Sequence, residues 1–155
     1  MSDSGKSTVV LDSSALVALL TDGGRLGDWV ADEVTGCALA APHVALFEVA
    51  SILRRQQLAG EIDASAATLA HTDLRALPLE LWPYALLAEK IWELREHLNA
   101  YDAAYVALAD LLGAPVVTLD AQLAKVDGLR CTVHLPPGRP PRGRAGASRP
   151  APDSR

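Results

Sequence analysis

Short apolar stretches alternate along this chain with longer stretches in which apolar residues recur every three to four positions. The stretches 8–11 and 115–119 are rich in Val and Leu, as buried strands are, whereas 44–59 has a helical pattern that ends at Gly60. Parallel strands need long crossover connections, and helices usually provide them. The sequence therefore predicts an α/β fold, with a mainly parallel sheet covered by helices on both faces.

The expected elements are bounded by Gly, Pro and capping residues, which begin or end helices and strands. The strands that we expect are 8–11, 37–41, 79–82, 115–119 and 131–135. The helices that we expect are 14–21, 25–34, 44–59, 63–77, 84–97, 101–112 and 121–126.

The 155 residues are enough for one domain with a real core. We assign this domain to residues 8–135, after a flexible N-terminal segment, 1–7. Residues 136–155 are rich in Pro, Gly and Arg without large apolar side chains, which predicts a disordered tail.

The net charge of −5 is distributed unevenly, because the tail carries five Arg and one Asp. The rest of the chain holds 9 basic and 18 acidic residues. An acidic body is poorly suited to gripping nucleic acid by surface charge alone, but it is suited to carboxylates that hold metal ions.

The sequence has no apolar stretch of the length needed for a signal peptide or a membrane span, which predicts a cytoplasmic protein without membrane contact. Cys37 and Cys131 lie in short apolar runs without metal-ligand spacing, so we expect two buried core thiols.

Two aspartates follow predicted strands directly. Asp12 comes after 8–11 and Asp120 comes after 116–119, so both are expected at the carboxyl edge of the sheet, where α/β proteins bind ligands. The alternative is that each aspartate only caps the helix that follows it.

Two further acids fall on apolar helical faces. Glu48 has Val44 and Ile52 at helical spacing, and a carboxylate in such surroundings needs a partner or a metal ion. A salt bridge to Arg54 or Arg55 is the alternative, although neither lies three or four positions away. Asp102 begins a helix, where capping would also explain a negative charge.

Convergence of these four acids would cause strong mutual repulsion without a cation. Oxygen ligands without clustered His or Cys favour Mg²⁺, with Mn²⁺ as the alternative, over zinc. Such ions can activate water and neutralise a scissile phosphate, which suits phosphodiester hydrolysis. Ser13 and Thr118, beside two of the acids, are candidates for hydrogen bonds to the carboxylates or the phosphate.

Four segments of the chain resemble the PIN-domain ribonuclease family and, more narrowly, VapC-type toxins of type II toxin–antitoxin systems. Each segment contains one of the four acids, and the segments are 9–16 (VVLDSSAL), 47–50 (FEVA), 101–109 (YDAAYVALA) and 117–124 (VTLDAQLA).

This resemblance implies a three-layer α/β/α sandwich, a homodimer and an endoribonuclease that uses Mg²⁺ or Mn²⁺ to cut structured RNA such as tRNA or rRNA. It implies that Asp12, Glu48, Asp102 and Asp120 ligate the metal and activate water. It also implies a VapB-type antitoxin that wraps around the toxin and blocks the cleft.

The residues themselves leave two alternatives open. Carboxylate chemistry does not choose a substrate, so a metal-dependent phosphatase or DNA nuclease would use the same four acids. A non-catalytic binding module would instead use them as helix caps and surface charges, and it would bind no divalent cation.

Overall fold

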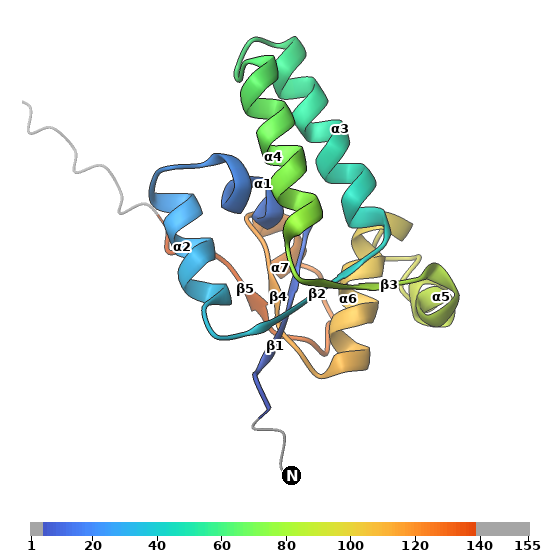
Figure 1. Ribbon diagram of the computed structural model, residues 1–155. Coiled ribbons are helices and arrows are strands. Elements are labelled where there is room, and N and C mark those ends of the chain that lie inside the picture. Colours follow the sequence, from blue (N-terminus) through green and yellow to red (C-terminus); the bar gives the residue numbers. More distant parts are fainter. Residues whose placement is uncertain (1–4, 139–155) are drawn as a thin grey trace, which may run out of the picture.

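The computed structural model describes residues 5–138, which form five strands and seven helices (Figure 1). The strands are β1 (Thr8–Leu11), β2 (Ala38–Pro42), β3 (Leu79–Trp82), β4 (Val116–Val117) and β5 (Val133–His134). The helices are α1 (Ser13–Thr21), α2 (Arg25–Val34), α3 (Val44–Leu58), α4 (Ala64–Ala76), α5 (Tyr84–Glu93), α6 (Ala100–Leu112) and α7 (Ala121–Ala124).

The five strands form one sheet in the order β3-β2-β1-β4-β5, and every neighbouring pair is parallel. The predicted α/β class is confirmed, and the sheet is parallel throughout. The chain builds outward from β1 through β2 to β3, then returns to place β4 on the other side of β1. Ligand sites of such sheets lie at the carboxyl ends of the two strands where the order reverses, which here are β1 and β4.

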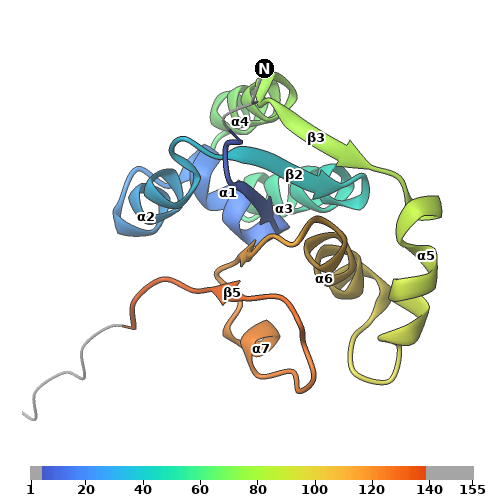
Figure 2. The same ribbon diagram turned by 90° about the horizontal axis from the view of Figure 1, so that it is seen from below.

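Helices cover both faces of the sheet, so the three-layer arrangement is also confirmed. Helix α6 packs against β1, β2 and β4, and α5 packs on α6. Helices α1 and α2 lie on the opposite side of the sheet (Figure 2). Helices α3 and α4 pack on α1 and on each other, forming a hairpin that extends to the top of the view in Figure 1.

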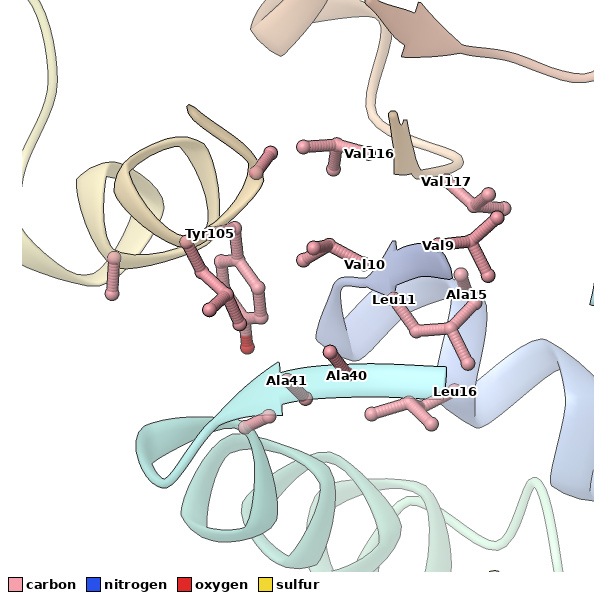
Figure 3. Packing of buried hydrophobic residues seen from close by; sticks show 14 of the residues in the cluster. Val9, Val10, Leu11, Ala15, Leu16, Ala40, Ala41, Tyr105, Val116 and Val117 are labelled. Carbon is pink, nitrogen blue, oxygen red and sulfur yellow. The ribbon is translucent and has the colours of Figure 1, made fainter. Parts of the chain in front are cut away.

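The core follows from side chains that alternate between the two faces of the central strands. Val10 and Val116 are fully buried and point toward α6, whereas Val9 and Val117 point to the other face (Figure 3). Residues 103–109 of α6 are all buried. A helix that is buried on every side needs small or apolar residues throughout, which explains why four of these seven are alanines.

Four predicted elements are shorter in the structure by two residues or more at one end. The helix expected over 121–126 ends at Ala124, and the strand expected over 131–135 is regular only at Val133–His134. The helix expected over 84–97 ends at Glu93, and turns then lead to Asn99, whose side chain caps α6. The strand expected over 115–119 is regular only at 116–117, although Thr118 N still donates to His134 O at 3.1 Å.

The cysteine prediction was wrong. Cys37 and Cys131 are free thiols, but both are only half-buried and lie at the margin of the core. Most of the predicted flexible segments, residues 1–4 and 139–155, lie outside the described residues. Ser7, which we assigned to the first of these segments, accepts a backbone hydrogen bond from Ala38 N.

Within residues 5–138, no helix is both long enough and apolar enough to cross a membrane.

Gly27 permits the close approach of α2 to the end of α1. A Cβ atom at this position would lie 1.9 Å from the carbonyl oxygen of Asp22. Relieving this clash would require the backbone to shift, which costs more than a side-chain rotation. We expect Gly27→Ala to lower the free energy of unfolding by about 1–3 kcal/mol, measured by urea denaturation. Gly23→Ala is the matched control, because its Cβ would meet no atom within 4 Å. Equal stability of the two variants would contradict this packing argument.

Candidate active site

Asp12 is buried at the carboxyl end of β1, and its carboxylate accepts three hydrogen bonds. Its Oδ1 accepts from Ala15 N at 2.9 Å and from Ser14 Oγ at 2.7 Å. Its Oδ2 accepts from Thr118 Oγ1 at 2.5 Å. Asp12 therefore does cap α1, as the alternative interpretation holds, but the cap uses only one of its two oxygens. The other oxygen faces the end of β4.

Two hydroxyl groups join the segment after β1 to the segment after β4. Ser14 Oγ accepts a hydrogen bond from Leu119 N at 3.0 Å and lies 3.4 Å from Thr118 Oγ1. Thr118 is fully buried, and its Oγ1 also accepts from Asp120 N at 2.9 Å. These bonds fix Asp12 and Asp120 relative to each other across the point where the strand order reverses.

Ser14 is a residue that the sequence interpretation missed. We named Ser13 as the supporting hydroxyl, yet among the described residues the serine that bonds to Asp12 is Ser14. Burial and Glu48 raise the pKa of Tyr105, and Ser13 acts against this rise. Both serines follow Asp12 directly, so the sequence alone did not distinguish between them. A role for Ser13 stays a prediction.

Glu48 on α3 is held by a tyrosine of α6. Its Oε1 accepts from the Tyr105 hydroxyl at 2.5 Å, and the Tyr105 ring is only 2% exposed. Figure 3 shows this ring among the core side chains with its oxygen pointing toward α3. Glu48 is half-buried, and within residues 5–138 it forms no ion pair with Arg54 or Arg55. Glu48 is thus held by the hydrogen bond from Tyr105 and not by a salt bridge to an arginine of its own helix.

Asp102 and Asp120 reach the same region from helix N termini. Asn99, rather than Asp102, caps α6, because its Oδ1 accepts from Asp102 N at 2.9 Å. The half-buried Asp102 carboxylate is thus not used as the cap. Asp120 is exposed and caps α7 through Gln122 N at 2.9 Å.

The charges of the four acids act on one another. Burial raises the pKa of Asp12 above its ordinary value, and the charge of Asp120 adds to that rise, against the lowering effect of its three hydrogen bonds. Burial also raises the pKa of Glu48, with contributions from the charges of Asp102 and Asp12. The pKa of Asp102 is raised by burial and by the charge of Asp120. These pairs link the four carboxylates into a closed ring of like-charge repulsion, from Asp12 to Asp120, Asp102, Glu48 and back to Asp12.

No basic side chain within residues 5–138 forms an ion pair with these acids. The ion pairs of this part of the chain join Lys90 to Glu93 and Asp110, and His134 to Glu33. Carboxylates that repel one another in a partly buried site, without an ion-pair partner, favour a bound cation.

The chemistry of the donor set fits a hard divalent cation, because all four groups are carboxylates. In the described part of the chain, no three His, Cys, Asp or Glu side chains are already spaced to hold one ion. A cation would therefore have to draw the carboxylates closer together than they lie.

Comparison with known proteins identifies the family of this chain. The sequence profile of the PIN domain matches residues 9–129. Ribonuclease VapC9 of Mycobacterium tuberculosis is 36% identical over 129 residues, which cover 83% of this chain and 98% of that protein. Ribonuclease VapC1 of the same organism is 35% identical over 127 residues, covering 81% and 96%.

The fold also matches a solved structure. The crystal structure of PAE2754 from Pyrobaculum aerophilum superposes with a TM-score of 0.61 and 25% identity, covering 84% of this chain and 87% of that one. The chain belongs to the PIN-domain family and, within it, to the VapC ribonucleases.

Proposed function

We propose that this protein is the toxin of a type II toxin–antitoxin system and that it hydrolyses RNA with Mg²⁺ bound by Asp12, Glu48, Asp102 and Asp120. Its membership of the VapC ribonucleases supports the RNA substrate and the toxin role. The observation that carries the metal site is the closed ring of repelling carboxylates without a paired cation. Mn²⁺ suits the same oxygen donors.

Neighbouring side chains would position the carboxylates that bind the metal. Thr118 and Ser14 hold the Asp12 carboxylate in one rotamer, and Tyr105 does the same for Glu48. Asp102 and Asp120 complete the ring from the start of two helices. When bound, divalent cations supply an activated water and neutralise the charge of the scissile phosphate.

The proposal extends to the protein's partners. We infer a structured RNA substrate such as tRNA or rRNA, a homodimer in the cytoplasm, and a VapB-type antitoxin that covers the acids. The unpaired negative charge at the site supports an antitoxin that places a basic side chain there, since such a contact relieves the repulsion.

Loss of a single carboxylate should abolish activity. We expect Asp12→Asn and Asp102→Asn each to lower Mg²⁺-dependent RNA cleavage by about 100-fold or more and to relieve growth arrest when expressed without antitoxin. Purified protein would be assayed on total RNA and on duplex DNA, with and without EDTA. Glu89→Gln, an exposed acid of α5, is the control. Parental cleavage by both variants would refute the site, and preferential DNA cleavage would refute the substrate class.

Metal binding should be visible in stability as well as in activity. Burial, and after it the negative charge of Asp120, raise the pKa of Asp102, so its ionised form opposes folding and Asp102→Asn should raise the melting temperature in EDTA. Mg²⁺ should raise the melting temperature of the parent protein and raise that of this variant much less. Differential scanning calorimetry with and without Mg²⁺ separates the two effects. An equal response of parent and variant to Mg²⁺ would contradict a role for Asp102 as a ligand.

Thr118 should act as a positioning residue. Thr118→Val keeps the side-chain shape but removes the donor to Asp12, so we expect a loss of about 10- to 100-fold in Mg²⁺ affinity or cleavage rate. Thr118→Ser keeps the hydroxyl and should restore most of both. Titration with Mg²⁺ by calorimetry gives the affinity independently of catalysis. If Thr118→Ser were as impaired as Thr118→Val, the hydroxyl would not be the cause.

A further inference from the structure

A groove of about 500 Å³ opens beside the acids, between one face of α3 and the first turn of α6. Phe47, Ser51 and Arg55 line it along α3, at positions four residues apart, and Tyr101 closes it from α6. Glu48 belongs both to this groove and to the ring of acids. The volume lies within the range of pockets that hold small ligands. The groove is therefore continuous with the proposed active site.

Two exposed aromatic rings line the groove. Phe47 is 76% exposed and Tyr101 is 59% exposed. A single exposed aromatic residue is ordinary, but here two lie in one groove, and each immediately precedes a site acid, Glu48 or Asp102. Exposed aromatic rings are the platforms on which proteins stack unpaired nucleobases.

A cation lies in the same groove. Arg55 is exposed on α3 two turns beyond Glu48, and within residues 5–138 it forms no ion pair. A guanidinium that is free of intramolecular partners can bind a phosphate group. Along α3 the groove thus presents an aromatic ring, a carboxylate and a cation in sequence.

We propose that this groove is a nucleobase subsite, in which an unpaired base of the RNA stacks on Phe47 and Tyr101 and a neighbouring phosphate binds Arg55. This inference rests on the proposed ribonuclease function and adds residues that select the substrate. A second copy of the chain is the competing occupant. It is less favoured, because Glu48 lines the groove and a second copy seated there would cover a carboxylate that the proposed cleavage needs open to RNA.

Binding of a fluorescent single-stranded RNA oligonucleotide tests the groove without relying on catalysis. Ca²⁺ would replace Mg²⁺ as the hard cation, fluorescence anisotropy would give the affinity, and gels would confirm that the RNA stays intact. We expect Phe47→Leu and Tyr101→Leu each to weaken binding about tenfold, the effect of one lost base stack, and Phe47→Trp to retain it. Trp92→Leu, an aromatic residue of α5 that is 67% exposed, is the matched control and should bind as the parent does.

An oligonucleotide with abasic sites sharpens this test. The parent should bind it about as weakly as the leucine variants bind normal RNA, and the leucine variants should hardly distinguish the two oligonucleotides. Arg55→Gln should weaken binding of both and reduce the salt dependence of binding.

Three results would overturn the proposal. The first is parental RNA affinity in both leucine variants. The second is a dimer of the parent that sedimentation shows to dissociate in these variants, while each chain keeps its RNA affinity. The groove would then be an interface between two copies. The third is an equal loss of affinity in Trp92→Leu. RNA cleavage by the parent in Mg²⁺ is measured separately. Its absence would refute the proposed function rather than the groove.

Discussion

Repulsion among four carboxylates is the constraint on which the rest of this structure depends. Burial and neighbouring negative charge both disfavour ionised Asp12, so the fold must hold it against its own electrostatics. Strands β1 and β4, which are buried apart from Thr8, provide a rigid base, and Thr118 and Ser14 supply hydroxyl donors beyond their ends. Stability of the core thus offsets the electrostatic cost of the buried carboxylate at the site.

Much of the fold could be predicted because its signals are local. Asp63 caps the start of α4 and Gly113 caps the end of α6, as expected, and α2 has the predicted bounds. The positions of Asp12 after β1 and of Asp120 beyond the end of β4 follow from short apolar runs, and parallel pairing of the two strands brings both acids to one edge. The end of α5 at Glu93 was harder to predict, because residues 94–97 contain no Gly or Pro that would mark the end of a helix.

The contacts that position the acids were harder to predict, because they join residues far apart in the sequence. Thr118 and Asp12 are 106 positions apart, and Tyr105 and Glu48 are 57 apart. The apolar helical face of Glu48 indicated that it needed a partner, but spacing along α3 pointed only to arginines of the same helix. Identifying Tyr105 required knowing that α3 and α6 approach each other, and that approach depends on the order of strands in the sheet.

The pairing of each aromatic residue with the acid that follows it has a geometric cause. Successive residues of a helix are rotated by about 100°, so two neighbours cannot face the same direction. When Glu48 and Asp102 turn toward the ring of acids, Phe47 and Tyr101 must turn outward, where nothing in the described chain buries them. The first turns of α3 and α6 can therefore carry chemistry on one side and substrate recognition on the adjacent side. A change in substrate preference could then evolve at Phe47 or Tyr101 without disturbing the carboxylates.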